Sequence, residues 1–154
     1  MPVFGSGFSP LSGFPRMGMI PVPTKTATAF TLTTGGGART LTAAECLGGL
    51  LVINCDDAQT ATLPTAALLN AALPGAASGA SFDVDIVNVG DATLTVAIGT
   101  GGTLVVGNSK STVATIVALA SKRFTILVTG VLEQGDSSDA YTVIGHGSIA
   151  AAVA

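Results

Sequence analysis

Short segments with an apolar residue at every second position recur along this chain, and this period of two is the feature that most restricts its fold. In the segment FDVDIVN at 82–88, apolar side chains share one face and two aspartates share the other. Together with one continuous apolar run, the expected strands cover residues 26–33, 50–55, 59–63, 82–88, 92–98, 103–106, 112–119, 123–129 and 140–145. Short strands at this spacing are typical of a β-sandwich or barrel.

The connections between these strands predict an antiparallel arrangement. Gly90-Asp91 is a turn sequence and predicts a hairpin between residues 82–88 and 92–98. The chain shows no regular alternation of strands with long helices, which disfavours a parallel sheet. No exact internal repeat is visible.

Two short helices are expected among the strands. Thr42, with Glu45 three residues later, makes a capping box for a helix that ends at Leu47. Thr65 is placed to cap a second helix that runs to Leu73. The predicted fold class is therefore mainly β: an antiparallel β-sandwich or jelly-roll-like domain with one or two short helices and an extended N-terminal arm.

The arm covers residues 1–24, and the β-domain covers residues 25–154. Five prolines exclude a helix in the arm, yet its large apolar side chains are too frequent for a solvated linker. Such an arm packs on its own domain or docks on a neighbouring subunit or a larger partner, and we favour the partner. The candidate partner-binding residues are Phe4, Phe8, Phe14, Arg16, Met17 and Met19.

Charge is scarce in this sequence. Charged residues make up 10% of the chain, and six Lys and Arg stand against nine Asp and Glu, so a nucleic-acid partner is not expected. The outward strand positions are mostly Thr, Ser and Ala, which leaves few charges to guard sheet edges against unwanted pairing. The alternatives are a compact monomer with few charges and a homo-oligomer or shell component, and we favour the assembled state.

A mean hydropathy of +0.67 raises the question of a membrane. Residues 58–82 carry no charge and are long enough to span, but Pro64, Pro74 and several Gly, Ser and Thr interrupt them. The N-terminus lacks the basic and apolar regions of a signal peptide. We therefore expect no membrane partner and folding in a cytoplasm.

Few residues suggest chemistry. Cys46 and Cys55 form no CxxC pair, and two buried thiols are a better interpretation than a disulfide. Carboxylates at 56, 57, 83 and 85 suggest a calcium site only if they meet, and solvated side chains are favoured. Glu133, Asp136 and Asp139 are expected at a solvated loop tip. No metal and no cofactor are predicted.

Catalysis is also not expected. His146 is the single histidine, and its neighbour Ser148 does not by itself make a catalytic pair. We predict that the chain is not an enzyme. That prediction would be reopened by a pocket in which Asp83, Asp85 and His146 converge.

The middle of the chain combines a TLTAAxxLGG helix turn at 40–49, the segment TLPTAALLxAALPG at 62–75 and the strands SFxVxIVN at 81–88 and ATLTV at 92–96. This order, over roughly residues 40–129, resembles small Thr/Ala-rich virion structural proteins of tailed bacteriophages, especially head decoration (cement) proteins. The arm does not align. The resemblance implies a β-sandwich without an active site, commonly a trimer, that clamps neighbouring major capsid proteins on the outside of the head.

On this interpretation the protein is made in the host cytoplasm and resides on the capsid surface of the virion. The alternative is a fibre or spike domain that binds a host glycan. Sugar sites usually stack rings on aromatic side chains. Aromatic residues make up only 5% of the chain, and Tyr141 is the one candidate expected to be exposed.

Overall fold

The computed structural model describes residues 25–32, 38–73, 75–106, 109–111, 113–132, 135, 136, 138–147, 149 and 150. The arm, with its six candidate partner-binding residues, lies outside the described residues. The described chain is mainly β, as predicted, with two short helices.

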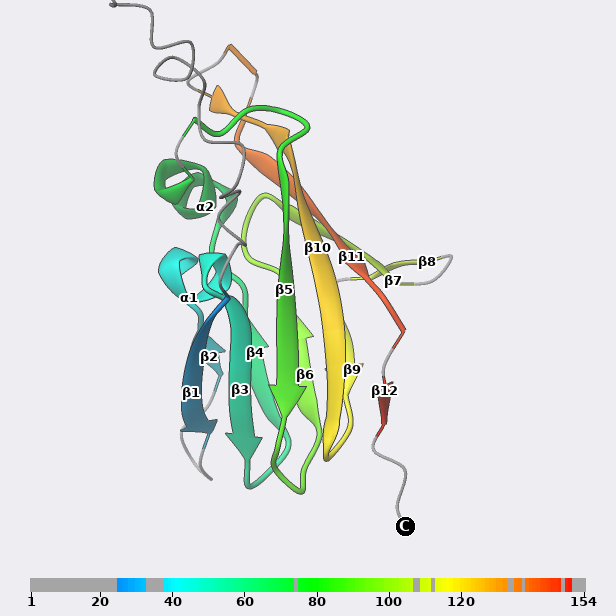
Figure 1. Cartoon of the computed structure of the whole chain (residues 1–154). Helices are drawn as coiled ribbons and strands as arrows, with labels where there is room; N and C mark the ends of the chain where they lie inside the picture. Colours follow the sequence, from blue (N-terminus) through cyan, green and yellow to red (C-terminus); the bar gives the residue numbers. More distant parts are fainter. Residues whose placement is uncertain are drawn as a thin grey trace, which may run out of the picture.

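Its strands form two sheets, and Figure 1 shows the smaller sheet behind the larger one. The larger sheet has the order β1 (Thr26–Leu32), β3 (Gly49–Cys55), β5 (Ser81–Asn88), β10 (Ala120–Gly130), β11 (Ala140–Gly145), β7 (Gly102–Val106) and β8 (Ser109–Ser111), and β12 (Ile149–Ala150) also pairs with β10. The smaller sheet has the order β2 (Arg39–Thr40), β4 (Gln59–Thr62), β6 (Leu94–Ala97) and β9 (Val113–Ile116).

The first six strands alternate between the two sheets. β1, β3 and β5 lie side by side and parallel in the larger sheet, while β2, β4 and β6 do the same in the smaller one. The helices α1 (Ala43–Leu47) and α2 (Ala66–Ala72) each return the chain to the larger sheet at the same end of the molecule (Figure 1). This half is therefore a coil of three turns, a structural repeat that the sequence does not display as an exact repeat.

The predicted antiparallel arrangement is wrong for this half, and so is the predicted hairpin. Both sheets are mixed, and the turn at Gly90-Asp91 carries the chain from β5 in the larger sheet to β6 in the smaller. The alternation in 82–88 correctly identifies the buried face, because Val84 and Ile86 are fully buried. A period of two fixes which face is buried but not which strand lies alongside.

Both helices begin as the sequence predicts. The Glu45 N–H donates to Thr42 Oγ1 at 3.2 Å, and the Thr42 N–H donates to Glu45 Oε2 at 2.8 Å, which completes the capping box. Thr65 Oγ1 accepts from the Leu68 N–H at 3.4 Å and caps α2. Arg39 pairs with Glu45 Oε1 at 2.5 Å, so the cap is also joined to β2.

One apolar core includes side chains from both sheets and both helices. Cys46 and Cys55 are buried in it as free thiols, in agreement with the preferred interpretation. Burial, together with the adjacent charge of Glu45, raises the pKa of the Cys46 thiol to about 12. Cys46 is therefore an apolar packing residue and not a nucleophile at neutral pH.

Two buried polar side chains join the sheets. Asn88, which is fully buried, donates from Nδ2 to the carbonyls of Ala92, Ile116 and Val117, and its Oδ1 accepts from the Gly90 N–H. It thereby fixes the crossing from β5 to β6 against the end of β9. Such satisfaction is what a polar group in a core requires.

Tyr141 is the second of these side chains. Only 1% of it is exposed, its hydroxyl donates to the Pro64 carbonyl, and the same oxygen accepts from the Gly99 N–H, both at 3.0 Å. The prediction of an exposed ring is therefore wrong, because the hydroxyl finds two backbone partners inside the fold.

Residues 58–82 divide among β4, a turn, α2 and the start of β5. Among the described residues, no helix is long and apolar enough to cross a membrane.

Candidate functional site

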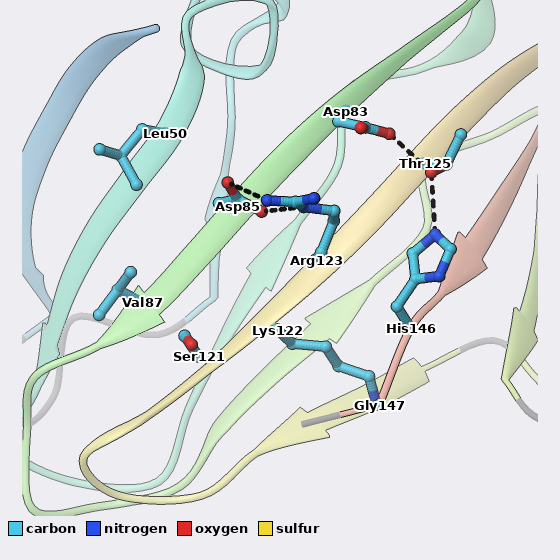
Figure 2. A pocket seen from close by; sticks show the side chains of 10 residues that line it. All are labelled: Leu50, Asp83, Asp85, Val87, Ser121, Lys122, Arg123, Thr125, His146 and Gly147. Carbon is cyan, nitrogen blue, oxygen red and sulfur yellow. Dashed lines mark hydrogen bonds and ion pairs between the residues drawn. The ribbon is translucent and has the colours of Figure 1, made fainter. Parts of the chain in front are cut away.

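A hollow of about 630 Å³ lies on the solvent face of the larger sheet, and we call it the β5–β10 pocket. Its lining residues come from four neighbouring parts of the sheet (Figure 2): Leu50 on β3, Asp83, Asp85 and Val87 on β5, Ser121, Lys122, Arg123 and Thr125 on β10, and His146 and Gly147 after β11.

Strand register brings the polar side chains of the pocket together. In the antiparallel pair β5–β10, Arg123 lies opposite Asp85 and Thr125 lies opposite Asp83. Directly opposed side chains on one face are within contact distance. The 146–147 segment continues from β11, and the His146 N–H donates to the Arg123 carbonyl at 2.9 Å.

Asp85 is held by two cations. Arg123 Nε lies 2.7 Å from Asp85 Oδ1, and Lys25 Nζ lies 2.5 Å from Oδ2. Hydrogen bonding from Arg123, followed by the hydrogen bond and charge of Lys25, holds the pKa of this carboxyl below its usual range despite partial desolvation. All three side chains are partly exposed, so these ion pairs contribute little to stability.

Asp83, Thr125 and His146 form a chain of hydrogen bonds (Figure 2). Thr125 Oγ1 lies 2.6 Å from Asp83 Oδ1 and 2.9 Å from His146 Nε2. An ionised carboxylate only accepts, so the threonine hydroxyl donates to Asp83 and accepts from the Nε2–H of the ring. In the neutral ring of this tautomer, Nδ1 is an acceptor.

This order differs from that of a nucleophilic triad. In a triad the histidine lies between the carboxylate and the hydroxyl and accepts the hydroxyl proton. Here Thr125 lies between Asp83 and His146, so its proton points to the carboxylate and the ring nitrogen is a donor. Asp83, Asp85 and His146 do line one pocket, which is the arrangement that would revive the hypothesis of an enzyme. Their hydrogen bonds, however, hold side chains in position and do not activate the hydroxyl of Thr125 as a nucleophile.

Lys122 differs from the other charged residues of the pocket. It alternates with Arg123 along β10, so its side chain leaves the strand on the core side, next to Phe124 and Gly145, and only 8% of it is exposed. Its side chain extends toward Gly147 at one end of the pocket (Figure 2), with Nζ 6.0 Å from the centre of the Phe124 ring. That distance is at the outer limit of a cation–π contact. Among the described residues, no carboxylate and no hydrogen-bond acceptor is recorded for the Lys122 ammonium.

The other carboxylates singled out in the sequence lie elsewhere. Asp56 and Asp57 are in the turn after β3, whereas Asp85 lies opposite Leu50 near the start of that strand. Six residues of strand separate those positions by about 20 Å. Within the described ranges, no group of three or more His, Cys, Asp or Glu is placed to hold a metal ion.

The loop after β10 is more ordered by hydrogen bonds than a solvated tip would be. Asp136 Oδ2 accepts from the Val131 N–H at 2.8 Å, and Asp139 Oδ1 accepts from Asn70 Nδ2 at 2.8 Å and from the Leu132 N–H. The hydrogen bond from Asn70, and then that from Leu132, lowers the pKa of Asp139. These two carboxylates therefore connect the loop to itself and to α2, while Glu133 lies outside the described residues.

A second surface lies at the opposite end of the molecule from the helices. It consists of Val89, Val117 and Leu119, which are 46%, 50% and 60% exposed, and we call it the apolar end. Leu119 has φ 53° and donates its N–H to the Gly90 carbonyl at 3.2 Å, so the β5–β6 and β9–β10 turns lie together. Among the strands that the structure describes, the adjacent strand β9 pairs with β6 and comes last in the order of the smaller sheet.

Sequence reasoning found only part of the pocket. It noted Asp83, Asp85 and His146 but did not single out Lys122, Arg123 or Thr125. The available signal was the pair of adjacent cations in a chain with only six Lys and Arg. The pairing of β10 with β5 is what places Arg123 beside Asp85 and Thr125 beside Asp83.

Comparison with known proteins identified no relative. No protein-family model, no curated protein and no solved structure matches the chain.

Proposed function

We propose that this chain is a virion structural protein, a capsid decoration (cement) subunit that binds the outside of a phage head and stabilises contacts between major capsid proteins. In this proposal it works as a homo-oligomer, a trimer, on the surface of the virion. Its two sheets form a β-sandwich, and the arm at 1–24 lies across capsid protein or an adjacent subunit through the six residues named for it.

The observation that carries this proposal is the uncharged edge of the smaller sheet beside the apolar end. From Val113 to Ala120 the chain carries no charged side chain. Proteins that remain monomeric usually guard an open edge with charges or proline. Val117 and Leu119 add exposed apolar area of the kind that a partner subunit covers. A subunit covered by copies of itself accounts for both features.

The alternative of a glycan-binding fibre domain is less well supported. It depended on Tyr141 as a stacking surface, and that ring is buried. The lining of the β5–β10 pocket contains no Phe, Tyr or Trp. We therefore do not propose glycan binding.

Light scattering of the purified chain tests the assembled state. We expect a trimer for the full chain and for a chain without residues 1–24, because the proposed contact lies in the β-domain. Leu119→Asp should give a monomer, since a charge at the apolar end would have to be desolvated in the contact. Leu68→Asp is the matched control, because Leu68 on α2 is 58% exposed but lies at the other end. A wild-type monomer would contradict the proposal.

Binding to undecorated phage heads tests the role itself. The full chain should co-sediment with heads and raise their resistance to heat or chelators. The chain without residues 1–24 should keep its fold and lose head occupancy, because the arm supplies apolar contact area. Unchanged occupancy of the truncated chain would contradict the role of the arm.

A further inference from the structure

The outer face of the larger sheet carries an apolar strip that leads from its edge strand β1 to the β5–β10 pocket. Cross-strand register places five small or apolar side chains there in two neighbouring rows, Ala27 beside Leu50, and Ala29 beside Val52 and Val87. Along each strand these residues alternate with more deeply buried ones, so all five point outward. Leu50 and Val87 also line the pocket (Figure 2).

One charge beside this strip has no counter-ion among the described residues. Lys25 and Arg123 both pair with Asp85, so these three charges compensate one another. Asp83 has the neutral hydroxyl of Thr125 as its recorded partner, at 2.6 Å, and takes part in no recorded ion pair. The outer face therefore offers apolar area next to a carboxylate that lacks a cation.

The N-terminal arm has the matching composition. Its large side chains are apolar, and Arg16 is the single charged side chain within residues 1–24. The arm joins the described structure at Lys25, whose Nζ lies 2.5 Å from Asp85 Oδ2. A Cβ on Gly49 would lie 3.3 Å from Lys25 Cγ, so this side chain passes over the start of β3. The arm therefore enters the sheet on its outer face, at the margin of the pocket.

The arm is also long enough to reach the pocket. Arg16 is nine positions before Lys25, and nine extended residues span up to about 30 Å. Neighbouring strands lie about 4.8 Å apart, so β5 is about 10 Å from β1 across β3. Arg16 can reach Asp83 with enough chain left for the arm to reverse its direction before Lys25.

We propose that the arm of each chain docks on the outer face of its own larger sheet, with the Arg16 guanidinium at Asp83 and with Met17 and Met19 on the apolar strip. Methionine side chains adapt to irregular apolar surfaces. Docking removes apolar area of both the arm and the strip from water, and it gives Asp83 a charge-assisted hydrogen bond. Because the arm and the face belong to one chain, the local concentration of the arm favours this contact.

The docked arm follows from the sheet face and the arm sequence alone. Its consequence for assembly rests on the proposed function, in which the same arm residues contact capsid protein or an adjacent subunit. The sheet face and the head then compete for one segment, and the free subunit keeps its apolar side chains covered until it meets a head. The two statements can fail separately, and the test has one part for each.

Limited digestion of the full chain with trypsin tests the docked arm, because Arg16 is the one tryptic site before Lys25. A synthetic peptide of residues 1–24 is the undocked reference, and mass spectrometry identifies cleavage after Arg16. We expect cleavage at least about tenfold slower in the full chain than in the peptide, because a docked site must open before the protease can bind it. Loss of this protection on dilution would assign the arm to a second copy and overturn docking on its own chain.

Asp83→Asn tests the charged contact. It removes the negative charge and keeps an acceptor for the Thr125 hydroxyl, so it should speed cleavage after Arg16 about threefold, the effect of one exposed ion pair. Asp91→Asn in the exposed turn is the matched control and should be cut like the wild type.

Ala29→Asp tests the apolar contact. It places a charge on the strip that the docked arm would have to desolvate, and cleavage after Arg16 should become about tenfold faster. Thr129→Asp is the matched control, because Thr129 is also exposed on the outer face but lies six residues along β10 from Arg123. The docked arm is overturned if the full chain is cut as fast as the peptide, or if either folded variant is cut no faster than its control.

For assembly, the binding of undecorated heads is compared between the wild type, Asp83→Asn and Asp91→Asn. Competition predicts that Asp83→Asn, with its arm released, binds heads about threefold more tightly than the other two. Equal binding by all three overturns the competition and leaves the docked arm standing. A protected arm in a wild type that does not bind heads overturns the decoration role alone, and an unprotected arm in a wild type that binds heads overturns docking alone.

Discussion

The two faces of the larger sheet use polar side chains in opposite ways. On strand β5, Asn88 faces the core and is fully buried, with its amide bonded to backbone groups at the end of β9 and in the turn between β5 and β6. Asp85 faces solvent, and its partners among the described residues are the ends of two flexible side chains, Lys25 and Arg123. The partners of Asn88 are fixed by the fold, whereas those of Asp85 can exchange for water or a ligand. The core face thus specifies the structure, and the outer face is available for recognition.

The largest effect should come from Asn88→Ala. This variant leaves the Gly90 N–H and three carbonyl oxygens without their partner in a dry environment, and we expect a loss of about 3 kcal/mol in the free energy of unfolding. Urea denaturation followed by circular dichroism measures it. Asn54→Ala is the control, because Asn54 is only part-buried and bonds to Asp56 beside it, and it should cost under about 1 kcal/mol. Equal losses would remove the distinction between the faces.

A smaller effect is expected from Tyr141→Phe, which deletes one buried hydroxyl and keeps the ring. The Gly99 N–H and the Pro64 carbonyl lose their shared partner, so the expected cost is about 1–2 kcal/mol by the same denaturation measurement. Burial raises the pKa of Tyr141, so the wild-type phenol should ionise only at a pH above its usual range. An absorbance titration of this single tyrosine that follows a free phenol in the folded protein would contradict its position in the core.

The smallest effect is expected on the outer face, from pH acting on Asp85. Because the folded pKa of this carboxyl is lowered, its contribution to stability is present above its unfolded pKa of about 4 and is lost as the pH falls through the folded value. Solvent screening reduces this contribution to a few tenths of a kcal/mol. Asp85→Asn should therefore change the stability difference between pH 6 and pH 3 by no more than that, compared with Asp91→Asn in the exposed turn. If Asp85→Asn changed this stability difference by more than about 1 kcal/mol, the ion pairs on the outer face would contribute substantially to stability, contrary to this prediction.

Local features of the fold were predictable, and long-range ones were not. The caps at Thr42 and Thr65 and the buried side of residues 82–88 follow from residues close in sequence, and the structure has them. Strand pairing depends on which strands lie alongside each other in three dimensions. A turn such as Gly90-Asp91 has the same composition whether it joins neighbours in one sheet or crosses between two.

For the pocket, too, the sequence predicted the residues that share one strand but not those that a second strand contributes. Asp83 and Asp85 were identified as partners on one face, because a period of two places them there. Thr125 and Arg123 reach them only through the pairing of β10 with β5, across about 40 positions of sequence. The burial of Tyr141 depended on Gly99 and Pro64, which are 42 and 77 positions away along the chain.

The alternation of the first six strands between sheets also has a consequence for folding kinetics. Within residues 26–97 no strand pairs with the next one along the chain, so each pair forms only after an intervening strand has crossed to the other sheet. The entropy of closing those loops is lost before any pairing contact is gained, which slows folding to the milliseconds-to-seconds range of β-proteins with non-local contacts. Unfolding has to separate the same interleaved turns, so a high barrier to unfolding is expected. The lifetime of the folded protein then depends on the height of this barrier more than on the free energy of unfolding.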